Sequence, residues 1–436
     1  MKITSYPINK PLKGTIILPG DKSISHRSII ISSIAMGKTK IVNLLESEDV
    51  HRTINALKKL GVKIYKKNNH TVVYGKGLNS LKKSKQKIFL GNSGTSARLL
   101  IGLLSNQNFN SLITGDQSLS KRPMKRIIDP INAMGGNIVS KKNLLPIAIK
   151  ANKKMKPIKY RLKIPSAQIK SGILLASLNI KGNTIIIEPS LTRDHTEIML
   201  KYFGANIKIR KINKNNIISI RGRKELKSSN IIIPGDFSSA AFFIVAALIT
   251  KGSDITLKNI NINPTRTGML KILLKMKANI KIKNRKVING EKVGDIKVKY
   301  SILKGCKVSS KLAPIMIDEY PILSIAASNA LGQSKFFGLK ELKVKESNRL
   351  ASIKNNLKKF NILTKVENDN LIIIPSKSKK KKPILIDSKK DHRIAMSFAI
   401  MGLVSSTKVI ISDSKYINTS FPNFIKLLNK IGGKII

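Results

Sequence analysis

One short phrase recurs six times along the chain: an apolar helix end, a residue suited to a left-handed backbone, and an apolar strand. Glycine after a helix adopts the left-handed conformation that ends the helix and turns the chain into a strand. Asn can take the same conformation, whereas Lys is a poor substitute that we expect to cost some stability. Successive copies lie 69 to 84 residues apart, and the key positions are Gly61, Gly135, Gly204, Lys277, Asn361 and Gly432.

A regular period of this kind indicates one supersecondary unit used repeatedly. Each interval is long enough for two helices and several strands, so six units predict a modular α/β protein. At 436 residues the chain exceeds what one hydrophobic core usually supports, and we expect two domains. The longest apolar run, residues 240–249, is about half the length of a membrane span, so we expect no membrane partner.

Cysteine and histidine usage argues against disulfides and metals. Cys306 stands alone, which excludes an internal disulfide and fits a reducing compartment. No Cys/His cluster has metal-ligand spacing, and the five histidines are scattered. The first residues lead into a strand-like segment, residues 14–18, without a signal or transit pattern. We therefore expect a cytoplasmic protein with no metal.

The formal net charge of +59 raises the possibility of a nucleic-acid partner, since basic proteins neutralise phosphates. Lys, however, is spread over nearly every segment, and no aromatic-rich basic strand or recognition-helix pattern is present. The chain also has no Trp. We expect no specific nucleic-acid partner, and we expect the charge to attract anionic substrates over long range.

Arg is scarce, at 14 of the 82 basic residues, and many Arg residues lie in short polar motifs beside predicted helix starts. Arg supplies a rigid bidentate fork for carboxylate or phosphate. Each motif taken singly indicates only a capped helix, but their recurrence at equivalent places in repeated units predicts that they face one cleft. The motifs span residues 18–27, 90–98, 119–124, 164–171, 192–197, 263–266, 316–321, 342–350 and 391–396.

Two Pro-Gly-Asp turns, residues 19–21 and 234–236, each precede an apolar helix and suggest matched crossings between domains. We expect Ser23 or Ser25 to cap the first of these helices. Lys22 and Arg27 would then lie at a positive helix N-terminus, which is a ready anion site. The Gly-rich turn at 91–94 lacks the Lys and the spacing of a P-loop, so we do not expect nucleotide binding.

The second half holds the acid–base candidates. Asp318 lies just before a Pro and an apolar helix. Lys345 and Arg349 are predicted to be i,i+4 neighbours on one helix face, with Glu346 and Arg349 at i,i+3. A purely structural ion-pair network is the alternative for this segment. Asp391 is expected to cap the helix that follows it.

The order and wording of these motifs resemble the 5-enolpyruvylshikimate-3-phosphate synthase family over essentially the whole chain, and most closely its bacterial class II. The diagnostic segments are residues 20–23, 166–170, 193–197 and 263–266. The resemblance implies a two-domain inside-out α/β barrel with helices inside, sheets outside and three βαβαββ units per domain. One domain would hold residues 20–235 and the other residues 1–19 and 236–436, with the active site in the cleft between them.

The resemblance also implies the reaction, which transfers the carboxyvinyl group of phosphoenolpyruvate to the 5-hydroxyl of shikimate 3-phosphate and releases phosphate. No metal or organic cofactor is implied. Asp318 would take the proton of the 5-hydroxyl, and Glu346 and Lys22 would handle the protons of the methylene carbon and the leaving group. The implied shikimate 3-phosphate ligands are Lys22, Ser23, Arg27, Ser166, Ala167, Gln168, Arg193, Asp318 and Lys345. The implied phosphoenolpyruvate ligands are Lys22, Gly94, Arg122, Gln168, Arg349 and Arg393.

The sequence departs from the family at two places. Asn348 stands where the family usually has Asp, and we expect this to loosen the positioning of Arg349. Thr419 and Ser420 precede the final Phe-Pro, so no C-terminal Lys is assigned. Gly94 leaves room for the inhibitor glyphosate, whereas the class II motifs suggest tolerance, and sensitivity stays open.

With phosphoenolpyruvate and shikimate 3-phosphate as the two substrates we expect a monomer. Two alternatives stay open as well. The sister enzyme UDP-N-acetylglucosamine enolpyruvyl transferase shares the fold, but it relies on a loop Cys, and Cys306 lies in the wrong half of the chain. A basic nucleic-acid-binding protein with a decayed active site would lack the catalytic residues, all of which are present.

Overall fold

The computed structural model describes residues 1–152, 154–376 and 380–436. The chain divides into two compact units. Unit 1 holds residues 1–19, 234–287 and 292–436, and unit 2 holds residues 20–233 and 288–291. The main divisions thus lie within two residues of the expected ones. The transfer of residues 288–291 to unit 2 was not expected from the sequence.

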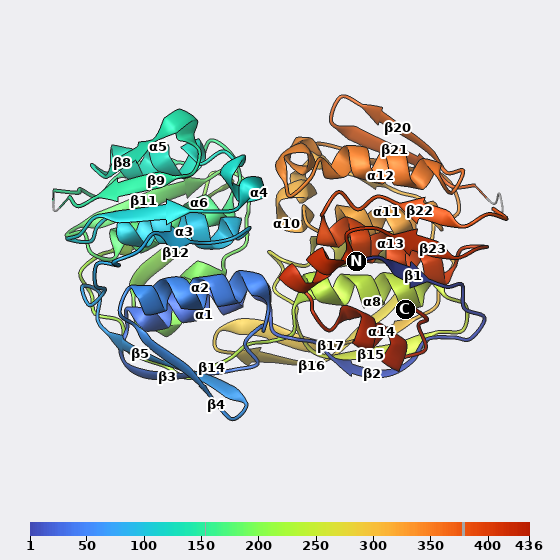
Figure 1. The fold of residues 1–436 in the computed structure, drawn as a ribbon, viewed down its shortest axis with the longest axis horizontal. Coiled ribbons are helices and arrows are strands. Elements are labelled where there is room, and N and C mark those ends of the chain that lie inside the picture. The colour runs from blue at the N-terminus through green and yellow to red at the C-terminus, as the bar shows by residue number, and fades with distance from the viewer. Residues whose placement is uncertain (153, 377–379) are drawn as a thin grey trace. The chain divides into compact units, whose positions relative to one another are not determined.

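Unit 2 is built from three repeats (Figure 1). The first is β14 (Ile231–Ile232), α1 (Lys22–Ser33), β3 (Met36–Val42), α2 (Glu48–Lys59), β4 (Lys63–Lys67) and β5 (His70–Lys76). The second is β6 (Ile88–Phe89), α3 (Gly94–Leu104), β7 (Ser111–Thr114), α4 (Gln117–Ser120), α5 (Lys125–Ala133), β8 (Asn137–Ser140), η1 (Lys141–Asn143) and β9 (Ile147–Lys150). The third is β10 (Lys159–Arg161), α6 (Ala167–Ser177), β11 (Asn183–Glu188), α7 (His195–Tyr202), β12 (Asn206–Ile212) and β13 (Asn215–Arg221).

Unit 1 repeats the same order. Its first repeat is β2 (Lys13–Ile17), α8 (Phe237–Ile249), β15 (Asp254–Asn261), α9 (Gly268–Lys275), β16 (Asn279–Ile288) and β17 (Glu291–Lys299). The next is β18 (Lys307–Val308), η2 (Ser310–Leu312), α10 (Ala313–Met316), α11 (Tyr320–Ser328), β19 (Ser334–Phe336), η3 (Lys340–Val344), α12 (Arg349–Lys358), β20 (Leu363–Glu367) and β21 (Asn370–Ile374). The last is β22 (Ile384–Ile386), α13 (His392–Leu403), β23 (Val409–Ile411), η4 (Ser414–Thr419), α14 (Phe424–Lys430) and β1 (Ile3–Ser5).

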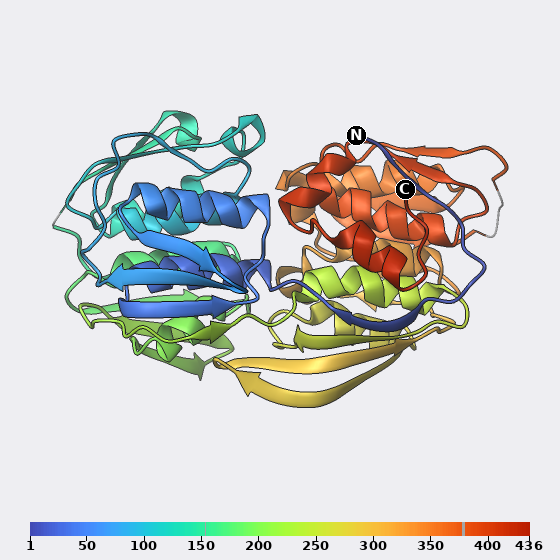
Figure 2. The same cartoon turned by 60° about the horizontal axis from the view of Figure 1, so that its bottom comes forward.

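Among the described residues, the strands form six sheets, one for each repeat. In β6-β7-β9-β8, for example, β6 and β7 are parallel and the β8–β9 hairpin adds two antiparallel strands. The last sheet has three strands, β1-β23-β22. In it the N-terminal strand β1 completes the C-terminal repeat. The backbone amide of Thr4 donates to the carbonyl of Ile436 at 2.7 Å, and both ends of the chain lie beside each other on unit 1 (Figure 2).

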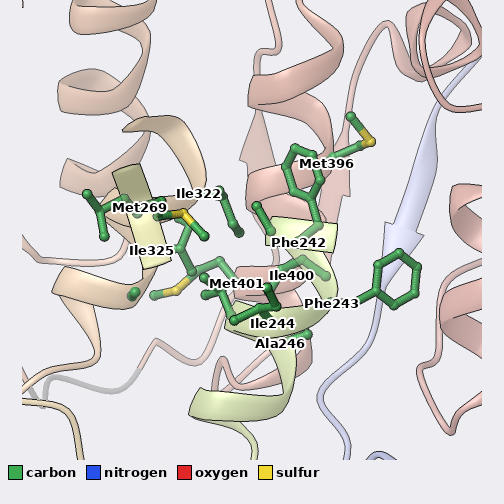
Figure 3. Packing of buried hydrophobic residues seen from close by; sticks show 14 of the residues in the cluster. Phe242, Phe243, Ile244, Ala246, Met269, Ile322, Ile325, Met396, Ile400 and Met401 are labelled. Atoms are coloured by element: carbon green, nitrogen blue, oxygen red, sulfur yellow. The ribbon is translucent and has the colours of Figure 1, made fainter. Parts of the chain in front are cut away.

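The first long helix of each repeat is buried on nearly all sides. In α8 every residue from Phe237 to Leu248 is buried, and α11 and α13 are buried along their whole lengths. Figure 3 shows Phe242 of α8, Ile325 of α11 and Ile400 of α13 packed together. A helix that is apolar all round is stable only in an interior. Strands such as β3 in unit 2 and β20 in unit 1, by contrast, expose alternate side chains. The expected arrangement of helices inside and sheets outside is therefore confirmed for each unit.

The run at residues 240–249 thus belongs to the central helix α8. No helix in the described ranges is long and apolar enough to cross a membrane.

All six recurring positions have the left-handed backbone that the sequence predicts. The φ angles are +87° at Gly61, +88° at Gly135 and Gly204, and +107° at Gly432. Asn361 has φ +60° and Lys277 has φ +68°. A left-handed conformation costs a residue with a Cβ about 1–2 kcal/mol, so Lys277 is a strained position.

The Pro-Gly-Asp turns cap their helices with the Asp itself. The carboxylate of Asp21 accepts from the amide of Ile24 at 2.9 Å, so the prediction that Ser23 or Ser25 caps α1 is wrong. Ser23 lies inside the first turn, two residues after the cap position at Asp21. Asp236 caps α8 in the same way, accepting from the amide of Ser238 at 2.6 Å. The predicted cap of α13 by Asp391 is confirmed.

Candidate active site

In unit 2 the predicted site residues gather at helix starts. Helix N-termini carry unpaired backbone N–H groups and a partial positive charge, which suits anions. Lys22, Ser23 and Arg27 lie on the first turns of α1, and Gly94 opens α3. Ser166 is the N-cap of α6, whose first residues are Ala167 and Gln168. Arg122 lies between α4 and α5, and Arg193 precedes α7.

Arg27 is held by three elements at once. Its Nε donates to the hydroxyl of Thr196 on α7 at 2.6 Å, and its Nη2 donates to the hydroxyl of Ser171 on α6 at 2.8 Å. Nη1 donates to the carbonyl of Ser23 at 2.9 Å. Burial lowers the pKa of Arg27 to about 10, although Glu197 and Asp21 oppose this effect. The guanidinium stays charged at neutral pH, and its orientation is fixed before any ligand binds.

Gly94, Arg98 and Arg122 form a second group. A Cβ on Gly94 would lie 2.8 Å from Nη1 of Arg98 and 3.2 Å from Nη1 of Arg122. The Arg122 guanidinium donates to the side-chain oxygen of Asn92. Only glycine lets both guanidinium groups come so close to the start of α3.

Gln168 joins α6 to α3 through both ends of its amide. Its oxygen accepts from Nη1 of Arg98 at 3.0 Å, and its nitrogen donates to the hydroxyl of Thr95 at 2.9 Å. Lys22 is paired with Asp49 of α2, with 3.1 Å between Nζ and Oδ2. Both side chains of that pair remain partly exposed, so the ammonium group is accessible to a ligand.

In unit 1 three cations surround the carboxylate of Asp318. Its Oδ1 lies 3.4 Å from Nη1 of Arg349 and 3.7 Å from Nζ of Lys345. Its Oδ2 lies 4.0 Å from Nη2 of Arg393, whose Nη1 also donates to the Asp318 carbonyl at 3.2 Å. The Asp318 side chain is 18% exposed. One partly exposed carboxylate therefore lies among three groups that attract anions.

Arg349 is the most constrained of these cations. Nε and Nη2 donate to the two carboxylate oxygens of Asp391 at 2.8 and 3.3 Å, and Nη2 is 2.5 Å from Glu346. Burial alone would lower the pKa of Arg349, but the carboxylates of Asp391, Glu346 and Asp318 outweigh burial and raise it. Arg349 is thus a permanent cation with a fixed orientation.

One expectation about this segment is wrong. Lys345 and Arg349 are not helical neighbours, because α12 begins only at Arg349 and Lys345 lies in the loop before it. The expected effect of Asn348 on the positioning of Arg349 stays a prediction. Asn348 caps α12 by accepting from the amide of Ala351 at 3.1 Å, while Asp391 and Glu346 hold the guanidinium. The ion pair between Glu346 and Arg349 is confirmed.

Arg266, from the segment 263–266, has a structural role. Its side chain is 2% exposed and pairs with Asp236 at 3.1 Å and Glu319 at 2.9 Å. These contacts join the starts of α8 and α11 to the loop before α9. Arg266 therefore supports the helix starts and is itself buried away from solvent.

Sequence reasoning missed the partners that orient the site residues. Asp49 pairs with Lys22, Ser171 and Thr196 hold Arg27, Asp391 holds Arg349, and Arg98 holds Gln168. A signal was available for the acidic ones, since Asp and Glu number only 23 against 82 basic residues. Ser171 and Thr196 lie in the polar motifs 164–171 and 192–197, but no local signal paired them with Arg27. In the described part of the chain, no group of three or more His, Cys, Asp or Glu side chains could hold a metal ion.

Comparison with known proteins identifies the family. The family model described as EPSP synthase (3-phosphoshikimate 1-carboxyvinyltransferase) matches residues 7–428. This chain belongs to the EPSP synthase family.

Relatives in the family match along nearly the full length. The 3-phosphoshikimate 1-carboxyvinyltransferase of Petrotoga mobilis is 47% identical over 435 residues, covering 99% of each chain. The enzyme of the same name from Gluconobacter oxydans is 44% identical and covers 97% of this chain and 96% of the relative. The solved structure of EPSP synthase from Acinetobacter baumannii has a TM-score of 0.88 at 43% identity, covering 100% of this chain and 99% of that one.

Proposed function

We propose that the chain transfers the carboxyvinyl group of phosphoenolpyruvate to the 5-hydroxyl of shikimate 3-phosphate, giving 5-enolpyruvylshikimate 3-phosphate and inorganic phosphate. The observation that carries the proposal is Asp318, a partly exposed carboxylate within 4.0 Å of Lys345, Arg349 and Arg393. Cations of this kind bind two polyanionic substrates, and the carboxylate is available to accept a proton. Family membership and the relatives' shared name support the same reaction.

In this proposal, unit 2 binds shikimate 3-phosphate through Ser23, Arg27, Ser166, Ala167, Gln168 and Arg193, and Lys345 of unit 1 adds to this set. Phosphoenolpyruvate is held by Lys22, Gly94, Arg122, Arg349 and Arg393, with Gln168 near both substrates. We propose that the two units act on one substrate pair, as a reaction between two bound anions requires. Fixed cations lower the cost of bringing the anions together and of the charge that develops between them.

The proposed chemistry runs through a tetrahedral intermediate. Asp318 accepts the proton of the 5-hydroxyl while the hydroxyl oxygen forms a bond to C2 of phosphoenolpyruvate. The methylene carbon C3 gains a proton in the same step. Loss of a proton from C3 and cleavage of the bond between C2 and the phosphate oxygen then release phosphate. The C2–C3 double bond re-forms, which gives the enol ether of the product. Glu346 and Lys22 are proposed to move the protons at C3 and at the leaving phosphate.

We further propose that the protein works as a cytoplasmic monomer.

Phosphate release by the purified protein tests this function. We expect release from phosphoenolpyruvate only when shikimate 3-phosphate is present. Phosphate release with UDP-N-acetylglucosamine in place of shikimate 3-phosphate would assign the chain to the sister reaction. No phosphate release with either acceptor would refute the proposal.

A further inference from the structure

The tip of the β16–β17 hairpin belongs to unit 2, although both strands lie in a sheet of unit 1. The tip is residues 288–291. Asn289 accepts from the backbone amide of Ile232 at 2.8 Å and donates to the carbonyl of Asn230 at 3.1 Å. A Cβ on Gly290 would lie 2.8 Å from the side chain of Ile198 on α7. The chain thus leaves unit 1 and returns to it within four residues.

At this tip Glu291 forms a buried ion pair. Its Oε1 lies 2.6 Å from Nδ1 of His195, the first residue of α7. The side chains of His195 and Glu291 are 0% and 5% exposed. A carboxylate only accepts, so Nδ1 of His195 carries the proton in this pair.

The pair adjoins, along α7, a residue that holds one of the proposed shikimate 3-phosphate ligands. Thr196, the next residue on α7, accepts from Nε of Arg27 at 2.6 Å and lies 2.6 Å from the hydroxyl of Ser171. Arg193 precedes His195 by two residues, in the loop that leads into α7. Glu291 therefore fixes the start of α7. This helix holds Arg27 through Thr196, and Arg193 lies in the loop just before it.

We propose that Glu291 is a positioning residue for the binding of shikimate 3-phosphate and that it acts through His195 and Thr196 on Arg27. The inference rests on the proposed function for the identity of the ligand. Without Glu291, the start of α7 loses its buried anchor and Arg27 loses the fixed acceptor for its Nε. The phosphoenolpyruvate group around Arg122 and Gly94 has no part in this chain of contacts.

Kinetics of Glu291→Gln test the proposal, with Glu367→Gln as the matched control. Glu367 is exposed on the β20–β21 hairpin, the equivalent hairpin of the next repeat. Losing one hydrogen bond to a charged group lowers affinity about tenfold. We therefore expect KM for shikimate 3-phosphate to rise about tenfold in Glu291→Gln. We expect kcat and KM for phosphoenolpyruvate to stay within about twofold, and the control to match the parent protein. Equal loss in kcat and both KM values, or no change at all, would overturn the proposal.

A pH series separates positioning from a general loss of stability. Burial alone would lower the pKa of His195, but Glu291 outweighs burial and raises it, with Asp21 adding to the rise and Arg27 opposing it. The ion pair is therefore strongest at low pH and weakens as pH rises through this pKa. We expect the ratio of the two proteins' KM values for shikimate 3-phosphate to shrink as pH rises. A ratio independent of pH would contradict the role of the pair.

Two further measurements cover the remaining outcomes. Hydrogen exchange at the start of α7 should be faster in Glu291→Gln, and this readout does not depend on activity. If that variant does not fold, Glu291→Asp should show the same split in weaker form. A parent protein that fails to bind shikimate 3-phosphate would defeat the proposed function, whereas unchanged exchange and unchanged KM in an active protein would defeat only the role of Glu291.

Discussion

Replacing Asp318 by Asn should abolish turnover without abolishing binding. The amide keeps the size of the carboxylate but cannot accept the proton of the 5-hydroxyl. General base catalysis contributes about 10²- to 10⁴-fold, so we expect kcat to fall by that factor. Arg349 keeps its contacts with Asp391 at 2.8 Å and Glu346 at 2.5 Å, so the fold should be retained.

The expected effect on binding has a definite sign. Asp318 lies within 4.0 Å of each of Lys345, Arg349 and Arg393, and the substitution removes its negative charge from beside these cations. Anionic ligands should therefore bind at least as tightly as they bind the parent protein. Calorimetric titration with shikimate 3-phosphate measures binding, and phosphate release measures kcat.

Asp369→Asn provides the control, because Asp369 pairs with Lys343 at 2.7 Å and is 34% exposed. A surface pair of this kind contributes about 0–1 kcal/mol, so the control should turn over normally. A kcat for Asp318→Asn within threefold of the parent would refute the assignment of Asp318 as the base. Loss of binding together with turnover would instead show that Asp318 holds the site together.

Three further predictions concern single side chains. Arg193→Ala should weaken binding of shikimate 3-phosphate about tenfold, in line with loss of one charged hydrogen bond, and an effect confined to phosphoenolpyruvate would contradict its placement. Lys277→Gly should raise the free energy of unfolding by about 0.5–1 kcal/mol in urea titrations, because relief of the left-handed strain exceeds the entropy cost of glycine, and a decrease would contradict this. Burial, with Lys22 and Arg27 adding to it, holds the pKa of His26 well below 6.5. The unfolded chain then binds the proton first, so stability should fall as pH drops below about 6.5, and His26→Asn should flatten that limb of the pH curve.

The local features of this fold could be predicted from the sequence. The six left-handed positions follow from one recurring phrase after a helix, which has Gly at four of them, Asn at 361 and Lys at 277. The burial of α8 follows from a helix with no polar face. The cap by Asp391 is also local, since a side chain reaches only the next turn. Features of this kind need no knowledge of which segments meet in space.

The contacts that orient the site could not be predicted in this way. Arg27 meets Thr196 across 169 residues, and Glu291 meets His195 across 96 residues. No spacing rule encodes such pairs, because they depend on how the repeats pack. Lys345 shows the converse error: charge spacing suggested a helix, but the helix begins only after Asn348 supplies its cap.

The fate of the two phosphorus atoms tests the proposed reaction most directly. Phosphorus NMR of the purified protein with both substrates distinguishes the enol phosphate of phosphoenolpyruvate from the ester of shikimate 3-phosphate. We predict that the enol phosphate signal is converted to inorganic phosphate, one for each acceptor consumed, while the 3-phosphate ester is retained in a new product. Phosphate derived from shikimate 3-phosphate, or released from phosphoenolpyruvate without the acceptor, would contradict carboxyvinyl transfer.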